Sequence, residues 1–203
     1  MTLAGAWGAW CIAISLAFVW PQVFRCVRHD TTHGISAFGT LHAISGSALW
    51  FTYGLVEYNL SMWFSNASFI TAQVIISAVL LRHGRLPARL VASFALAEAV
   101  LLCAGLFGPR GTLGWVAIFV SGSGMVPNVV HVHRAHSLHG ISISSWALTV
   151  VSASSWTAYG WIIGDPVITY VNYFTIPLMI YVIVKAWRWR VANGMPVFAA
   201  AAG

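Results

Sequence analysis

Long apolar stretches alternate with short polar breaks along the whole chain. The stretches long enough to cross a membrane occupy residues 4–24, 37–56, 61–81, 86–107, 113–130, 143–163 and 166–186. A bilayer core about 30 Å thick is crossed by roughly 20 residues of α-helix, which matches these lengths. The breaks between them hold Gly, Pro or charged residues and are too short for a second domain. The pattern predicts an all-α integral membrane protein with seven transmembrane helices.

The composition supports this fold class and changes how the charge is interpreted. Of the 203 residues, 59% are hydrophobic and 7% are charged, whereas about a quarter of the residues in a soluble domain carry charge. A net charge of +6 would suggest nucleic-acid binding in a soluble protein. Here Lys and Arg lie in the connections between apolar stretches, so we interpret them as a topology signal and expect no nucleic-acid partner.

The positive charges fall almost entirely on one side of the predicted membrane. Only Arg110 lies on the other side, and cytoplasmic loops are the ones that retain Lys and Arg. We therefore expect a multi-pass protein of the cell membrane with its N-terminus outside and a cytoplasmic C-terminal tail, residues 187–203. The first stretch reads as a retained helix because no Lys or Arg precedes it. The nine residues on the inner side are Arg25, Arg28, Arg82, Arg85, Arg89, Arg134, Lys185, Arg188 and Arg190.

The sequence contains an internal repeat with an offset of 106 positions. This offset relates Pro21 to Pro127 and maps the four residues 33–36, His-Gly-Ile-Ser, onto residues 139–142 without a gap. Four consecutive matches in the same register as rare Trp and Asn indicate duplication, not chance. The other matched pairs are Trp50 with Trp156, Tyr53 with Tyr159, Gly54 with Gly160, and Asn66 with Asn172.

The repeat defines the domain organisation. Residues 4–81 form the first three-helix repeat and residues 113–186 form the second. A three-span unit starts and ends on opposite sides, so a copy in the same orientation needs one additional crossing, which residues 86–107 supply as a linking helix. The prediction is two parallel three-helix bundles in a 3+1+3 order, with the substrate path between them.

Depth selects the candidate substrate-binding residues. Trp50 lies 13 residues after the inner end of its span, about 20 Å from the inner face. Asn66 enters from the outer side and reaches a similar height, and the repeat places Trp156 and Asn172 at the same level. A flat apolar ring and an amide that both donates and accepts are complementary to a sugar. Two alternatives stand beside this interpretation, since Trp is common at membrane interfaces and a buried Asn often bonds only a neighbouring helix.

Other motifs have weaker claims to a chemical role. Pro21 and Pro127 lie near the inner ends of their spans, where a proline either permits bending or ends the helix. A group of four histidines, residues 131, 133, 136 and 139, lies in a basic loop without Cys or carboxylate, so we expect no metal. The run Gly122-Ser123-Gly124 lacks the strand-to-helix context of a hydrolase nucleophile. We expect no catalytic residues, no cofactor and no enzyme activity.

The pattern resembles the SWEET and SemiSWEET sugar transporters, the MtN3/saliva type of the PQ-loop superfamily. The resemblance covers nearly the whole chain and is to a bacterial-like two-repeat member, because the two Trp are closer to the bacterial half-size proteins than to plant members. The resemblance rests on these motifs: Pro21-Gln22 and Pro127-Asn128, the two Gly-Ile-Ser loops, the Trp-x2-Tyr-Gly runs, and the asparagines Asn66 and Asn172.

The resemblance implies a role for each matched position. Trp50, Asn66, Trp156 and Asn172 become the sugar site, and the motifs Pro21-Gln22 and Pro127-Asn128 become hinges. Tyr53 and Tyr159 fall near an outer gate that SemiSWEETs close with charged partners. Here the residues beyond the tyrosines differ between repeats, with Glu57 and Asn59 in one and Ile163 and Asp165 in the other. This difference puts a symmetric gate in doubt.

These features predict a facilitative carrier that moves a small neutral sugar by alternating access. Glu98, the only carboxylate well inside a span, lies in the linking helix outside the repeats, which favours uncoupled transport. One chain completes one pocket, so a homo-oligomer is not required. The alternatives are a PQ-loop transporter of an amino acid or other metabolite, with or without protons, and a seven-helix receptor. A retinal-type receptor needs a mid-span Lys, and the chain has only Lys185 at an inner end.

Overall fold

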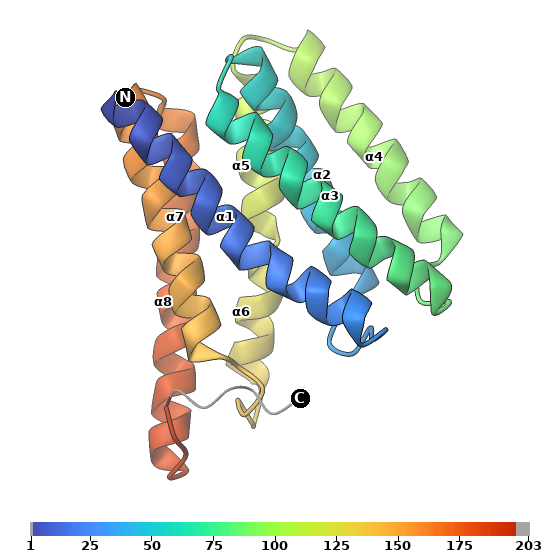
Figure 1. The fold of residues 1–203 in the computed structure, drawn as a ribbon, viewed down its shortest axis with the longest axis vertical. Helices are drawn as coiled ribbons and strands as arrows, with labels where there is room; N and C mark the ends of the chain where they lie inside the picture. Colours follow the sequence, from blue (N-terminus) through green and yellow to red (C-terminus); the bar gives the residue numbers. More distant parts are fainter. Residues whose placement is uncertain (1, 198–203) are drawn as a thin grey trace. The chain divides into compact units, whose positions relative to one another are not determined.

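The structure is a computed structural model that describes residues 2–197, and every regular element in that range is an α-helix (Figure 1). Thr2 caps the first helix, accepting a hydrogen bond from the Gly5 N–H at 3.1 Å. The helices are α1 (Leu3–Arg28), α2 (Ala37–Val56), α3 (Leu60–Arg82), α4 (Ala88–Phe107), α5 (Thr112–Ser123), α6 (Met125–Arg134), α7 (Ile143–Ile163) and α8 (Pro166–Ala192).

The predicted fold class is confirmed, because α5 and α6 together form one of seven spans. Five spans in the described part of the chain meet strict criteria of length and hydropathy, and one of them is Thr112–Arg134. The two spans below that threshold are α2 and α7, which are nevertheless 20 and 21 residues long. Their mean hydropathy falls because both are rich in Ser, Thr, Trp and Tyr. These are the two helices that carry the candidate tryptophans.

Several helices extend past the predicted apolar stretches at their C-terminal ends. Helix α1 runs to Arg28 and α3 to Arg82, and α8 continues to Ala192, so residues 187–192 of the predicted tail are helical. Hydropathy detects only the hydrocarbon-spanning part of a helix. Basic residues near a helix C-terminus also interact favourably with the exposed carbonyl groups there, so the helix continues through them.

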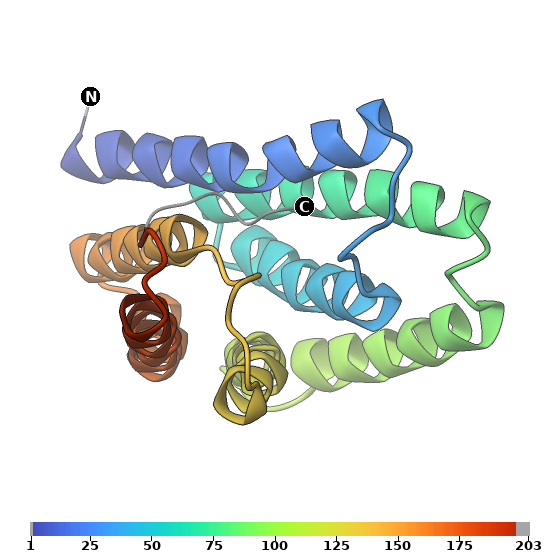
Figure 2. The same ribbon diagram turned by 90° about the horizontal axis from the view of Figure 1, so that it is seen from below.

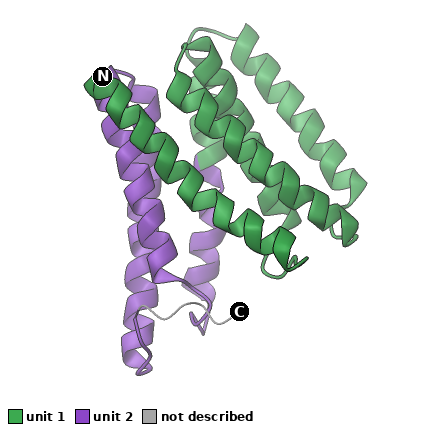
Figure 3. Cartoon of the chain, in the orientation of Figure 1, with its two compact units in different colours: residues 1–121 green, residues 122–203 purple. Residues whose placement is uncertain are grey.

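The chain divides into two compact units, Met1–Ser121 and Gly122–Gly203 (Figure 3). In the first unit α3 contacts both α1 and α2, and α2 also contacts the linking helix α4. Figure 2 shows this order within the unit as α1, α3, α2 and α4. The third helix of the repeat is therefore its central helix.

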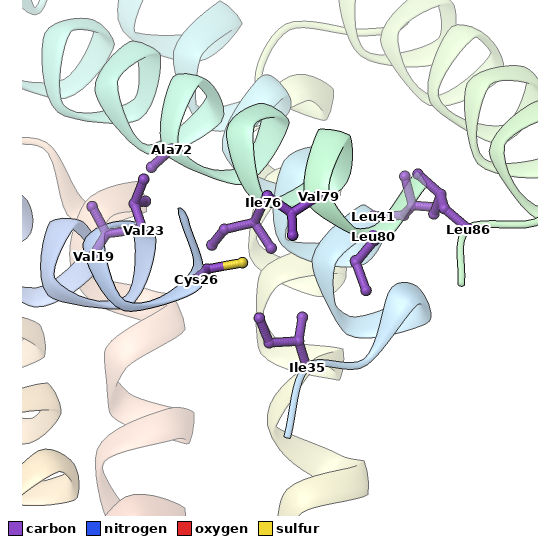
Figure 4. Close-up of a cluster of buried hydrophobic side chains, with 10 residues drawn as sticks. All are labelled: Val19, Val23, Cys26, Ile35, Leu41, Ala72, Ile76, Val79, Leu80 and Leu86. Carbon is purple, nitrogen blue, oxygen red and sulfur yellow. The ribbon is translucent and has the colours of Figure 1, made fainter. Parts of the chain in front are cut away.

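The core of the first unit lies toward the C-terminal ends of α1 and α3. Cys26, Ile76 and Leu80 are fully buried there, and side chains from α1, α3 and the segment that leads into α2 converge on them (Figure 4). The complete cluster of buried residues is Val19, Val23, Cys26, Ile35, Leu41, Ala72, Ile76, Val79, Leu80 and Leu86.

The second unit repeats this arrangement with its own residues. Helix α8 contacts both α6 and α7, so it corresponds to α3 as the central helix. Its core brings Val182 and Ala186 of α8 together with Val132 and with Leu138 and Ile143 around the loop before α7. The two repeats thus share their internal helix order as well as their sequence.

In each repeat an arginine side chain donates hydrogen bonds to backbone carbonyl oxygens of the His-Gly-Ile-Ser loop. Arg85 donates to the carbonyl oxygens of Thr32 at 2.6 Å and Ile35 at 3.3 Å. Arg190, which is 1% exposed, donates to the carbonyl oxygen of Ile141 at 3.0 Å. Ile35 and Ile141 are matched positions of the repeat, so these motif loops supply backbone acceptors for a guanidinium group.

The two arginines do not share the register of the repeat. An offset of 106 pairs Arg85 with Val191, so Arg190 lies one position out of register. Arg190 has a long side chain with forked donors, so it reaches the matched carbonyl oxygen, that of Ile141, although it lies one position out of register. Arg190 also donates to the carbonyl oxygens of Pro196 and Val197, at 2.9 and 3.0 Å.

Replacing Arg190 by Ala is expected to destabilise the protein by about 3 kcal/mol or more, because several backbone carbonyls lose a charged donor and a buried space opens. Arg188→Ala, two residues away at an exposed position, is the matched control and should change stability by less than about 0.5 kcal/mol. Thermal unfolding of both variants in detergent measures the difference. Equal midpoints for the two variants would contradict the anchoring role of Arg190.

Candidate functional site

Each repeat presents a tryptophan and a tyrosine one helical turn apart on its second helix. The ring centroids of Trp50 and Tyr53 lie 5.7 Å apart at an interplanar angle of 87°. The rings of Trp156 and Tyr159 lie 5.6 Å apart at the same angle. This edge-to-face geometry is a favourable one for aromatic pairs, and it holds each indole in one orientation. Tyr53 and Tyr159 are both 6% exposed, so each pair is anchored from its tyrosine end.

The glycine after each tyrosine allows the second and third helices of a repeat to touch. A Cβ atom added to Gly54 would lie 2.7 Å from the backbone nitrogen of Trp63 on α3. A Cβ atom on Gly160 would lie 2.7 Å from Thr169 Cγ2 on α8. Both distances are closer than carbon contacts tolerate, so only glycine permits this approach. The Tyr-Gly part of the motif is explained by this packing.

The asparagines are held in matching ways on the third helices. Asn66 Nδ2 donates to the Met62 carbonyl oxygen at 2.9 Å, and Asn172 Nδ2 donates to the Ile168 carbonyl oxygen at 3.2 Å. Each bond fixes the amide plane against its own helix and uses one of the two N–H donors. The second N–H and the oxygen Oδ1 retain capacity for a further partner.

Ser121, which the sequence pattern does not single out, is hydrogen-bonded to the candidate residue Trp50. It lies on α5, and the Trp50 indole Nε1–H donates to its hydroxyl oxygen at 2.7 Å. A Cβ atom on Gly46 of α2 would lie 3.3 Å from the same oxygen, so the two helices are close at this level. The one signal in the sequence is that the repeat pairs Ser121 with another serine, Ser15. A hydroxyl is too common in membrane helices to be recognised from that signal alone.

Asn59 and Asp165, at matched positions beyond the tyrosines, have the same structural role despite their different identities. Asn59 Oδ1 accepts from the Met62 N–H at 3.1 Å and caps α3. Asp165 Oδ1 accepts from the Val167 N–H at 3.0 Å and caps α8. Asn and Asp are both strong N-cap residues, so the substitution preserves this function. The outer gate of Tyr53, Tyr159 and Asp165 stays a prediction.

The prolines do not end their helices. Helix α1 continues beyond Pro21 to Arg28, and α6 continues beyond Pro127 to Arg134. The alternative that these prolines simply terminate a helix is therefore wrong. The hinge role of Pro21-Gln22 and Pro127-Asn128 stays a prediction.

The two proline motifs differ in local structure. Helix α5 ends at Ser123, four residues before Pro127, where a proline ring clashes with the preceding turn. Asn128 Nδ2 donates to the Gly124 carbonyl oxygen at this break, at 3.1 Å. In the first repeat α1 is unbroken around Pro21. The predicted span 113–130 is thus a helix in two parts.

The candidate residues are distributed over both compact units. Trp50 and Asn66 belong to the first, and Trp156 and Asn172 belong to the second. Each unit thus holds one Trp and one Asn in equivalent local settings, and their assembly into one ring stays a prediction.

Residues 2–197 contain no group of three His, Cys, Asp or Glu suited to a metal ion. In the histidine-rich segment, His133 Nδ1 is hydrogen-bonded to the Tyr181 hydroxyl at 2.8 Å.

Comparison with known proteins connects this geometry to a family. Residues 106–186 match the MtN3 family model, described as a sugar efflux transporter for intercellular exchange. The fold is similar to that of a eukaryotic SWEET transporter, with a TM-score of 0.72 and 14% sequence identity over 94% of this chain and 100% of that one. No curated protein matches the sequence. The resemblance drawn from the motifs is confirmed, by sequence in the second repeat and by fold along nearly the whole chain.

Replacing Gly54 or Gly160 by Ala is expected to separate the paired helices and to destabilise the protein by about 1–3 kcal/mol. Gly140→Ala is the matched control, because a Cβ atom there meets nothing within 4 Å. Thermal unfolding in detergent compares the three variants. A midpoint for Gly54→Ala as high as that for Gly140→Ala would show that the close contact does not limit stability.

Proposed function

We propose that this chain, which has the SWEET fold and matches the MtN3 family over its second repeat, is a facilitative carrier of a small neutral sugar. The observation that carries the proposal is the equivalence of the two half-sites. Each has an indole held edge-to-face on a buried tyrosine and an asparagine amide fixed to its own helix. A molecule that binds both halves must offer apolar faces and hydroxyl groups together.

The chemistry of the half-sites fits a sugar better than a charged metabolite. An indole face packs against the C–H surface of a sugar ring, while an amide oxygen and N–H satisfy its hydroxyl groups. None of the four residues carries a charge that would pair with a carboxylate or an ammonium group. We therefore assign Trp50, Asn66, Trp156 and Asn172 to sugar binding, in a pocket shared by the two repeats.

Uncoupled transport is the mode that the acidic residues support. The sequence has four of them, and Asp30, Glu57 and Asp165 all lie outside the helical spans. The fourth, Glu98, lies on the linking helix. A carboxylate on the substrate path is the usual requirement for proton coupling, and neither repeat has one within its helices. We propose alternating access about Pro21 and Pro127, with the N-terminus outside and the tail inside, as the basic inner loops favour.

The first test is counterflow of labelled mono- and disaccharides in proteoliposomes. Each of Trp50→Ala and Trp156→Ala should lower exchange about tenfold, the equivalent of roughly 1.4 kcal/mol of lost binding, and the double variant should abolish it. Trp187→Ala is the control because its side chain is exposed near an inner helix end. Full exchange by the double variant would remove the site assignment. Counterflow of amino acids but of no sugar would instead favour the other class of PQ-loop transporter.

The second test concerns Ser121, which orients Trp50 without a proposed contact to the sugar. Ser121→Ala removes one hydrogen bond of about 0.5–1.5 kcal/mol and should raise the half-saturation concentration about two- to tenfold, with little change in maximal rate. Ser93→Ala is the control, since its exposed hydroxyl donates only to the carbonyl oxygen of Arg89 on its own helix. A change in maximal rate alone would argue against a positioning role.

A further inference from the structure

Glu98 is a half-buried acidic group that the proposed transport cycle does not use. It is the eleventh residue of α4, about 15 Å from the inner end of that helix. In a hydrocarbon core about 30 Å thick this position is near the midplane. Intramembrane carboxylates are costly and are retained for a reason.

The surroundings of Glu98 offer it a single neutral partner. The hydroxyl of Ser45 on α2, which is 7% exposed, forms a short hydrogen bond with Glu98 Oε2. The second oxygen, Oε1, is buried without a hydrogen-bond partner among the described residues. The contact joins the linking helix to the first repeat, because α2 is the helix that packs on α4.

Within residues 2–197, the helices α2 and α5 that meet α4 carry no Lys or Arg that could compensate a negative charge on Glu98. On α4 the other polar ionisable groups are Arg89, nine residues toward the inner end, and Cys103. Helix α2 brings His42, half-buried one turn before Ser45, and Tyr53 near its outer end. Helix α5, which meets α4 where Leu113 lies against Gly105, has no charged residue.

In these surroundings the protonated form of the Glu98 carboxyl group has a lower free energy than the ionised form. An anion with one neutral donor and one bare oxygen loses most of its hydration without replacement, which costs several kcal/mol or more. A neutral carboxylic acid can donate its O–H to the Ser45 oxygen and leave Oε1 as a carbonyl oxygen. An unpartnered carbonyl oxygen costs far less than an unpartnered anionic oxygen.

Asp30 provides the contrast within the same unit. It lies in the inner loop after α1, where it is paired with both His83 and Arg82. The hydrogen bond from His83, together with the adjacent guanidinium group, lowers the pKa of this carboxyl group below its ordinary value. Two acids of one unit therefore stand in opposite environments, one beside cations at the surface and one against a hydroxyl in the membrane.

We propose that Glu98 remains a neutral carboxylic acid in the membrane, that its pair with Ser45 fastens the linking helix to α2, and that it is a site of modification by hydrophobic carbodiimides. In this reaction the acid adds across a C=N bond of the carbodiimide. The proton passes to nitrogen, and the O-acyl adduct rearranges to a stable N-acylurea that retains every atom of both reactants. An ionised carboxylate lacks the proton that this addition consumes.

The first experiment treats the reconstituted full chain with dicyclohexylcarbodiimide at about pH 7, where unperturbed carboxyl groups are ionised. Peptide mass spectrometry should find one adduct, at Glu98, and none at Asp30, Glu57 or Asp165. The variant Glu98→Gln should lose the adduct completely. Labelling of Glu98 only under acidic conditions would overturn the proposal, because it would show an ionised group at neutral pH.

A second measurement removes the dependence on reagent access. The infrared difference spectrum of wild type minus Glu98→Gln should contain the carbonyl band of a neutral carboxyl group at about pH 7. Asp30→Asn is the matched control and should give carboxylate bands. Carboxylate bands in the Glu98→Gln difference would overturn the proposal. If these carboxylate bands disappeared when His42 was also replaced by Gln, the result would indicate an ion pair between Glu98 and His42 instead of a neutral carboxyl group.

The fastening role has its own readout. Glu98→Gln keeps a polar group that can donate to Ser45, so its thermal midpoint should stay close to that of wild type. Ser45→Ala leaves the acid without a partner and should lower the midpoint. A larger loss for Glu98→Gln than for Ser45→Ala would contradict a neutral fastening group.

Discussion

The structure depends on close contact between the second and third helices of each repeat. Lipid tails are as apolar as the side chains that face them, so the hydrophobic effect does not press helices together inside a bilayer. Contact then relies on small residues and van der Waals packing. Gly54 and Gly160 provide it, since each leaves room for the facing helix where a methyl group would collide with it. This helix contact therefore also determines where the neighbouring Trp and Tyr rings lie.

The second constraint is that polar side chains in the membrane need partners nearby. Many Ser, Thr and Asn side chains meet it within their own helix, by donating to a carbonyl oxygen four residues earlier, as Asn66 and Asn172 do. Other polar side chains find partners on neighbouring helices, and helix α2 makes two such contacts. Trp50 donates to Ser121 of α5 and Ser45 bonds Glu98 of α4. Both contacts fix the helix that carries Trp50.

The two His-Gly-Ile-Ser loops show how a repeated fold tolerates sequence divergence. Ile35 and Ile141 keep their register, and each offers a carbonyl oxygen to an arginine. The arginines themselves are one position out of register, and the asparagine of one outer cap is an aspartate in the other. In each case the physical role persists while the residue or its position changes. Backbone acceptors and helix N-termini make few demands on the identity of the group that satisfies them.

The sequence by itself determined the seven spans, the linking helix and the repeat, because a hydrocarbon core imposes a length and an apolar composition that are visible residue by residue. It also selected Trp50, Asn66, Trp156 and Asn172, since duplication marks matched positions. Only the tertiary structure decided that α5 ends before Pro127, that Asn59 and Asp165 are both caps, and that Ser121 and Ser45 hold Trp50 and Glu98. These are properties of pairs distant in the chain or of backbone geometry. Hydropathy and spacing describe one residue or one helix at a time, so they contain no information on which side chains meet.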